Sequence, residues 1–373
     1  MMQVYNLQRQ NNNTQKKAKI VLEDGKVFFG FFFGKTKESF GDLVFSTAMS
    51  GYQEILTDPS YFKQIIVLTF PEIGIYGVNM LENESDKIYL SGLIVDKYIE
   101  NDFFNNFDQS FEQFLKKKNC CGVFGVDTRA LTEYLRENGS KKCCITFEET
   151  STEEVIKKLN KMTFKNHVKD LKVKKITFFY KKEHLKNKKK VLFYDLGTKK
   201  SILDHFIKKN YELFVVSWNF SFSEIKKINP DLIFLSNGPG DPRELVYLIE
   251  QIKKAIAQKY FVFGICLGLQ IIGLALGFKI EKLKFGHHGV NHPIIDNNNK
   301  IFITSQNHDY VLIDDKKIND IEIIFRSGFD NSIEGIKSKN HKIFCVQFHP
   351  EANPGPKDMD WIFKKFFNYF QNE

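Results

Sequence analysis

The stretch that decides the fold is FVFGICLGLQIIG at 261–273, in which Cys266 lies between Gly264 and Gly268. One apolar run precedes the cysteine and another follows it. This form is typical of a strand that turns sharply into a helix, with glycines where no Cβ would fit. The turn would push the Cys266 side chain out at the edge of a sheet, and the helix N-terminus beside it would favour thiolate. A cysteine considered alone is more often a small buried hydrophobic residue, so a catalytic role for Cys266 depends on other parts of the sequence.

From residue 190 onward, short β-rich runs alternate with helix-like stretches. The β-rich runs are VLFYDLG (191–197), ELFVVSW (212–218), DLIFLSNG (231–238) and YFVFGIC (260–266). The helix-like stretches between them are KKSILDHFIKKN (199–210) and DPRELVYLIEQIKKAIAQ (241–258). This βαβ rhythm predicts a parallel sheet covered by helices on both faces. Ligands of such sheets bind outside the carboxyl ends of the strands, where SNGPGDP (236–242) and GICLG lie.

A histidine that can serve Cys266 follows another β-rich run, IFCVQFHPE at 343–351. His349 comes at the end of that run, so we expect it at the same sheet edge as Cys266. Glu351, two residues on across a proline, could turn back toward the imidazole. A thiolate nucleophile needs such a histidine to move the proton, and a third group to orient it. The Leu267 N–H and the turn 238–240 could donate to a developing oxyanion.

The first half of the chain has a different pattern. KIVLEDGKVFFGFFFG (19–34) predicts two strands around the turn Asp24-Gly25. VDTRALTEYLRENG (126–139) predicts a helix that ends at Gly139, with Ala130, Leu131, Tyr134 and Leu135 on one face. We predict a disordered extension at 1–17, a smaller β-rich α/β domain at 18–160, a Lys-rich linker at 161–189 and the α/β domain at 190–373.

Composition limits the function classes. The chain has 373 residues, enough for two domains, and a formal net charge of +9. Its abundant Phe, Ile, Asn and Lys share AT-rich codons, so we attribute the charge to base composition and predict no nucleic-acid binding. No apolar stretch could span a membrane, and the polar N-terminus lacks a secretory signal. The six cysteines show no CxxC spacing, which predicts free thiols in the cytoplasm or an organelle stroma.

GICLG followed far downstream by HPE resembles the class I glutamine amidotransferases, whose Cys-His-Glu triad hydrolyses the side-chain amide of glutamine. Further segments make the chain similar to the small subunit of carbamoyl-phosphate synthetase over about residues 18–370. These segments are GYQEILTDPSY (51–61), PEIGIYG (71–77), VDTRALTEYLRE (126–137), SNGPGDP (236–242), KFGHHGVNHP (284–293) and QNHDY (306–310). The resemblance implies an amidotransferase domain with a mostly parallel sheet, and an N-terminal domain that contacts the large synthetase subunit.

The resemblance also implies roles for individual residues. Cys266 would be the nucleophile, and His349 and Glu351 would complete the triad. The positions that would contact glutamine are Gly238, Gly240, Leu267, Gln270, Asn307, Asp309 and Tyr310. Three residues depart from the family pattern. Ala48 replaces a serine that would contact the substrate, and Leu269 replaces a histidine outside the triad. Asp309 replaces a glycine. If position 309 needs a positive φ, Asp is among the better substitutes for glycine.

The implied activity is hydrolysis of glutamine to glutamate and ammonia through a cysteine thioester. The ammonia would pass to the large subunit, which makes carbamoyl phosphate from bicarbonate and two ATP for arginine and pyrimidine biosynthesis. We expect a heterodimer or an oligomer of heterodimers, with no cofactor in this chain and ATP and metal ions on the partner. No G-x-x-x-x-G-K-[ST] sequence is present, and we predict no metal at the histidines of 284–293.

Two other readings stay open. The chain could be the amidotransferase of another synthetase, such as anthranilate synthase, although those subunits resemble its C-terminal half alone. It could also be a catalytically silent regulator of a large subunit. The intact Cys266, His349 and Glu351 argue against that second reading, whereas Ala48 and Asp309 keep it open.

Overall fold

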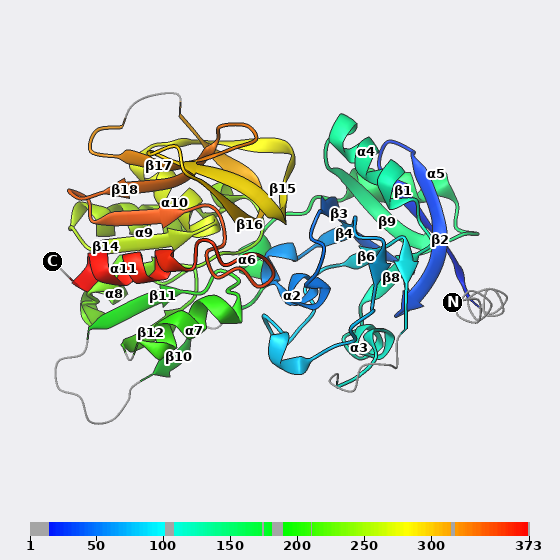
Figure 1. Cartoon of the computed structure of the whole chain (residues 1–373), viewed down its shortest axis with the longest axis horizontal. Coiled ribbons are helices and arrows are strands. Elements are labelled where there is room, and N and C mark those ends of the chain that lie inside the picture. The colour runs from blue at the N-terminus through cyan, green and yellow to red at the C-terminus, as the bar shows by residue number, and fades with distance from the viewer. Residues whose placement is uncertain are drawn as a thin grey trace. The chain divides into compact units, whose positions relative to one another are not determined.

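The computed structural model describes residues 15–100, 108–173, 175–180, 189–209, 211–314 and 318–371. Contacts within the chain divide it into two compact units, each assembled from three segments (Figure 1). The first unit comprises Met1–Ser46, Lys63–Glu82 and Leu90–Phe164. The second unit comprises Thr47–Phe62, Asn83–Tyr89 and Lys165–Glu373.

The first unit is a closed barrel with strand order β1-β2-β8-β6-β4-β3-β9. Its strands are β1 (Lys17–Leu22), β2 (Val27–Gly34), β3 (Ser39–Ser46), β4 (Gln64–Leu68), β6 (Gly92–Ile94), β8 (Cys121–Phe124) and β9 (Lys141–Phe147). The other elements of this unit are β5 (Glu72–Ile73), β7 (Lys97–Tyr98), η2 (Met80–Glu82), α3 (Phe111–Lys117), α4 (Thr128–Asn138) and α5 (Thr152–Lys161). The barrel leaves none of its seven strands at an open edge, which protects the sheet from pairing with other chains.

Two local predictions for this unit are confirmed. Strands β1 and β2 pair antiparallel around the Asp24-Gly25 turn. Helix α4 ends at Gly139, whose φ of 81° suits a residue without a Cβ. The predicted apolar face of α4 is narrower than expected, because Leu131 is buried but Ala130 is exposed.

The second unit contains a ten-stranded sheet with the order β10-β12-β11-β13-β14-β19-β18-β17-β15-β16. The parallel strands at its centre are β12 (Glu212–Val216), β11 (Lys190–Tyr194), β13 (Leu232–Leu235), β14 (Phe261–Ile265) and β19 (Ile343–Val346). The antiparallel strands on either side are β10 (Ile176–Tyr180), β15 (Lys279–Asp296), β16 (Ile301–Ile313), β17 (Glu322–Ser327) and β18 (Ile333–Ser338). The predicted βαβ rhythm is therefore confirmed, and antiparallel strands extend the sheet on both sides.

Helices cover both faces of the parallel strands. Because side chains alternate along a strand, Leu192 and Tyr194 enter one apolar core, whereas Val191 and Phe193 enter the other. The helices that pack into the first core are α8 (Phe222–Ile228), α9 (Val246–Ala257) and α10 (Leu267–Leu276). The second core receives α7 (Lys200–Lys208) and α11 (Trp361–Gln371). Cys266 follows the carboxyl end of β14 and His349 that of β19, the edge at which ligands of such sheets bind.

Two segments from the first half of the sequence belong to the second unit. Thr47–Phe62 carries α2 (Tyr52–Thr57) and η1 (Pro59–Tyr61), and Asn83–Tyr89 follows η2. Both lie inside the range 18–160 that the sequence assigns to the N-terminal domain. They matter for the site because they bring two carboxylates, Asp58 and Glu84, to the amidotransferase-like sheet.

The predicted extension and linker are only partly described. Residues 1–14 of the extension lie outside the described residues, and Lys17 begins β1. Within 161–189, the structure describes α6 (His167–Asp170) and β10, whereas 174 and 181–188 lie outside the described residues. In the ranges described, no helix has both the length and the apolar character that crossing a membrane requires.

Candidate active site

Cys266 occupies the sharp turn between β14 and α10. Its backbone has φ 53° and ψ −108°, an unusual conformation for a residue with a Cβ, and its N–H donates to the Val346 carbonyl at 2.9 Å. A Cβ added at Gly264 would lie 2.6 Å from the carbonyl carbon of Gly268. One added at Gly268 would lie 2.3 Å from the Leu235 oxygen. Both glycines are therefore required by close approach of the backbone at the elbow.

The thiol is less exposed than the sequence indicates. Only 2% of the surface of Cys266 is exposed, although it lies at the carboxyl edge of the sheet. Its Sγ atom is 3.6 Å from the main-chain oxygen of Asn307 on β16. The antiparallel extension of the sheet, which the βαβ pattern does not reveal, supplies this cover.

His349 and Glu351 follow β19, the strand next to β14. The His349 Nδ1 atom lies 2.6 Å from Glu351 Oε1, and both side chains are buried. Burial would lower the pKa of His349, but the Glu351 charge and the interaction with Cys266 raise it to about 10. The Nε2 atom has no hydrogen-bond partner among the described residues, and the raised pKa places on it the proton that the Cys266 thiol gives up. The structure brings the three predicted catalytic residues together at one sheet edge.

Lys199, which the sequence reading missed, completes this group. Its Nζ atom lies 2.9 Å from Glu351 Oε1 and 2.5 Å from the Ala352 oxygen, and 3% of the residue is exposed. Burial would raise the pKa of Glu351, but Lys199 and His349 lower it to about 2. Glu351 is therefore a carboxylate held between two cations, and a group in that state stabilises the imidazolium of His349.

The turn after β13 lies beside the elbow. A Cβ added at Gly238 would be 2.9 Å from Leu267 Cδ2 and 2.2 Å from the Leu196 oxygen, so only glycine fits there. Gly240 has φ 90°, and an added Cβ would meet the ring of His167 at 2.6 Å. The turn therefore packs closely against Leu267, the first residue of α10, and the two groups predicted to donate to the oxyanion lie near each other.

Gln270 and Tyr310 are tied to one another. Gln270 is one turn along α10 from Cys266, and its Nε2 atom donates to the Tyr310 oxygen at 2.8 Å. The guanidinium carbon of Arg243 lies 5.4 Å from the centre of the Tyr310 ring. The Asp241 carboxylate interacts with the Tyr310 hydroxyl. The hydrogen bond from Gln270 therefore brings these two predicted glutamine contacts together, one on α10 and the other on β16.

Asn307 and Asn237 share one carboxylate, that of Asp58. Asp58 is 5% exposed; its Oδ2 accepts from Asn307 Nδ2 at 3.3 Å and its Oδ1 from Asn237 Nδ2 at 3.4 Å. Because the Asp58 carboxylate can only accept, Asn307 Nδ2 faces it, and Asn307 Oδ1 lies 2.8 Å from His288 Nδ1. The Asn237 Oδ1 atom accepts from the Lys199 N–H at 3.1 Å. Asp58 thereby joins β16, the turn after β13 and the loop that carries Lys199.

Glu84 acts on the same loop. Its Oε2 atom accepts from the Ser201 N–H at 3.0 Å and from the Ser201 hydroxyl at 2.7 Å, at the start of α7. Burial would lower the pKa of Lys199, but the charges of Glu351, Glu84 and Asp58 raise it. Three carboxylates, two of them from segments early in the sequence, therefore keep Lys199 charged inside the protein.

The three departures from the family pattern have separate settings. Leu269 is buried in the apolar core, so a hydrocarbon side chain fits there. Asp309 lies within β16 and accepts from His288 Nε2 at 3.1 Å; it is not among the described residues with positive φ. Ala48 is 4% exposed and follows Thr47, whose N–H donates to the His288 oxygen at 3.2 Å.

Selective alkylation tests the elbow. All six cysteines are free and buried, and burial raises the pKa of Cys121 and Cys144 to about 12 and raises that of Cys345. We expect a glutamine-like electrophile to label Cys266 first, because only this thiol lies beside His349 and a helix N-terminus. Peptide mapping after limited labelling measures this, and glutamine should protect the site. First labelling at Cys121 or Cys345, without protection by glutamine, would contradict the assignment.

Comparison with known proteins agrees with the geometry. Residues 192–369 match the family Glutamine amidotransferase class-I, the class of protein that this sheet and Cys-His-Glu site define. Residues 20–145 match Carbamoyl-phosphate synthase small chain, CPSase domain. The Clostridium perfringens carbamoyl phosphate synthase small chain is 43% identical over 356 residues, covering 95% of this chain and 99% of that one. The Aquifex aeolicus protein of the same name is 40% identical over 372 residues, covering 96% and 100%. The chain belongs to the carbamoyl phosphate synthase small chain family.

Proposed function

We propose that this chain is the glutaminase subunit of a glutamine-hydrolysing carbamoyl-phosphate synthase. The observation that carries the proposal is the buried Cys266–His349–Glu351 group at the carboxyl ends of β14 and β19. Membership of the small chain family supports glutamine as the substrate and a large subunit as the partner.

Hydrolysis proceeds in two stages. The raised pKa of His349 keeps the Cys266 proton on its Nε2 atom, so Sγ attacks the carboxamide carbon of glutamine as the thiolate and forms a tetrahedral intermediate. The N–H of Leu267 and the Gly238–Gly240 turn stabilise its oxyanion. His349 returns the proton to the leaving nitrogen, the C–N bond breaks, and ammonia departs from a γ-glutamyl thioester.

Water completes the cycle. His349 takes a proton from a water molecule, which attacks the thioester and releases glutamate, and the thiol is regenerated. Glu351 holds the imidazolium in both stages, and Lys199 keeps Glu351 ionised between them. No cofactor takes part in these steps, and the ATP-dependent steps belong to the large subunit.

We further propose that the ammonia reaches the large subunit without passing through bulk water, because ammonium has no lone pair for attack. This requirement favours a stable heterodimer, or an oligomer of heterodimers, in the cytoplasm or an organelle stroma. The test is to mix the chain with its large subunit and follow glutamate and carbamoyl phosphate together. Equal yields support the proposal, whereas glutamate release without any coupled product would contradict it.

Ala48→Ser tests the missing substrate contact. A restored hydroxyl should lower KM for glutamine and leave kcat nearly unchanged, the sign of uniform binding. One neutral hydrogen bond contributes on the order of 1 kcal/mol, so about tenfold is the upper limit. Steady-state glutaminase kinetics measure the effect, and Ser50→Ala, an exposed position two residues on, is the matched control. An unchanged KM would mean that the pocket wall is differently shaped in this chain.

A further inference from the structure

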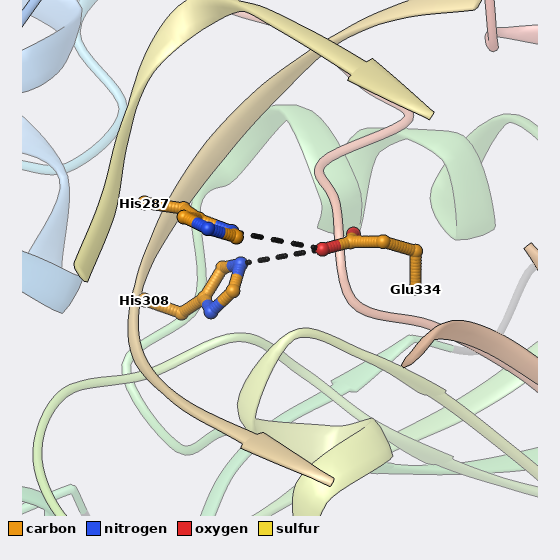
Figure 2. A group of neighbouring side chains, drawn as sticks. All are labelled: His287, His308 and Glu334. Carbon is orange, nitrogen blue, oxygen red and sulfur yellow. Dashed lines mark ion pairs between the residues drawn. The ribbon is translucent and has the colours of Figure 1, made fainter. Parts of the chain in front are cut away.

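The hairpin of β15 and β16 brings together three side chains that the proposed hydrolysis does not use. His287 lies directly opposite His308 across the hairpin, and Glu334 reaches both from β18 (Figure 2). The Glu334 Oε1 atom is 3.8 Å from His287 Nδ1 and 3.8 Å from His308 Nε2. All three residues are buried, and Glu334 is 0% exposed. By strand alternation, this face of β16 is opposite to the one that carries Asn307.

Both imidazoles are held by their far nitrogen atoms. The His308 Nδ1 atom lies 3.0 Å from the Tyr310 main-chain oxygen, which can only accept, so Nδ1 carries the proton. The His287 Nε2 atom lies 3.0 Å from the Asp330 carboxylate and carries a proton for the same reason. In the neutral rings, His308 Nε2 and His287 Nδ1 therefore present lone pairs to the space in front of Glu334. Metal-ligating histidines are oriented in this way, by a carboxylate or a backbone carbonyl on the other nitrogen.

Gln306 adds a fourth acceptor. The hydroxyl of Thr304 donates to the His292 oxygen, so Thr304 Oγ1 is free to accept from Gln306 Nε2 at 3.2 Å. That contact turns Gln306 Oε1 toward the two rings, 3.1 Å from His287 Nδ1 and 3.0 Å from His308 Nε2. Its oxygen therefore adds a further lone pair to the group.

The carboxylate of Glu334 lies beside the two rings but beyond hydrogen-bond distance from them. Neither oxygen of Glu334 has a hydrogen-bond partner among the described residues, and 3.8 Å is too long for a hydrogen bond to either ring. A buried carboxylate that faces two imidazoles at 3.8 Å, without a hydrogen bond, is costly unless a cation lies in front of it. Either an extra proton on a ring nitrogen or a bound metal ion would supply this positive charge and interact with the lone pairs of the two rings and of Gln306.

We propose that His287, His308 and Glu334, with the amide oxygen of Gln306, form a binding site for one divalent transition-metal ion of the zinc type. Two imidazoles and a carboxylate suit this class of ion better than Mg²⁺ or Ca²⁺, which prefer oxygen ligands. The donor atoms of the three ionisable residues lie within 4.8 Å of one another. A tetrahedral zinc site requires about 3.3 Å between ligands, so small rotations of the side chains would close the site.

The role of this ion is structural and separate from glutamine hydrolysis. Its ligands lie on three strands, β15, β16 and β18, which a bound ion would join although the ligands are spread over residues 287 to 334. Holding β16 also holds Asn307, whose oxygen covers the Cys266 thiol from the other face. The sequence analysis predicted no metal at the histidines of 284–293, because that segment resembles a structural stretch of the family; His287 is the one histidine of that segment in the proposed site.

The test uses the full chain carrying Cys266→Ala, so that the active-site thiol cannot bind the metal. Protein stripped with a chelator is titrated with Co²⁺, and then with Zn²⁺ in competition. We expect one equivalent of Co²⁺ with the visible bands of a nitrogen- and oxygen-ligated ion and no sulfur-to-metal charge transfer. Saturating Zn²⁺ should raise Tm by roughly 5 °C.

Variants decide which residues bind the metal. Glu334→Gln and His308→Gln should each weaken binding at least about 100-fold, and Asp330→Asn, which only orients His287, by about 10-fold or more. His341→Asn, a histidine outside the cluster, should leave binding unchanged. Failure of the Cys266→Ala protein to bind Co²⁺ would overturn the proposal and assign the cluster an extra proton instead. Equal binding by Glu334→Gln or His308→Gln would also overturn it.

Discussion

Cys266→Ser should abolish glutamine-dependent synthesis of carbamoyl phosphate and leave ammonia-dependent synthesis intact. The serine hydroxyl stays protonated near neutral pH, and the His349 imidazole, already held by Glu351, is not arranged to activate it. Glutamine hydrolysis should fall by about a thousandfold or more. With the large subunit present, high ammonium at raised pH should still give product, because free ammonia bypasses Cys266.

The matched control is Cys345→Ser, the same substitution on β19, where the residue pairs in register with Gly264. This variant should keep both activities, apart from a loss of stability. Loss of both activities in Cys266→Ser would show that the residue is structural. Retention of both would remove Cys266 from catalysis.

Lys199→Met should have the second largest effect. Removing one partner of a buried ion pair costs about 3–5 kcal/mol in free energy of unfolding, because Glu351 would keep a buried charge with one cation fewer. Glutaminase kcat should fall by roughly 10- to 100-fold, since a less firmly ionised Glu351 stabilises the His349 imidazolium less well. Thermal unfolding and glutaminase assays measure the two effects separately.

Acid should separate this variant further from the wild type. Glu351 has a pKa of about 2 in the folded chain, below that of a glutamate in the unfolded chain. Its charge therefore stabilises the folded chain at any pH above the unfolded pKa, and this stability is lost as the pH falls toward 2. Without Lys199 that pKa rises, and the variant should unfold at a less acidic pH. Lys200→Met is the control, because the exposed Lys200 side chain forms an ion pair with Asp204 at the surface. Equal effects of the two substitutions would show that the Lys199 pair has no special role.

The local pattern predicted the centre of the site well. Glycines around Cys266 and a strand-end His349 follow from the geometry of a strand that turns into a helix, and the parallel strands bring both to one edge. Lys199 left a weak signal, since it also follows a β-rich run, after β11. A search for cations at every strand end would have found it.

Other parts of the site left no signal in the sequence. Asp58 meets Asn237 across 179 residues, and neither periodicity nor spacing reports a contact at that separation. The burial of Cys266 depends on β15 and β16, whose antiparallel pairing is independent of the βαβ rhythm. The proximity of Glu334 to His308 could not be predicted either, because it depends on the order of the strands in the sheet.

The division into units also has a consequence for heredity. The chain passes between its two compact units five times, at 46/47, 62/63, 82/83, 89/90 and 164/165. A recombination event in the 161–189 stretch would therefore transfer an amidotransferase sheet without Asp58 and Glu84. The recipient would have to supply other acceptors for Asn237 and Asn307, and other anions beside Lys199. The two halves are thus expected to be inherited together, although each has a core of its own.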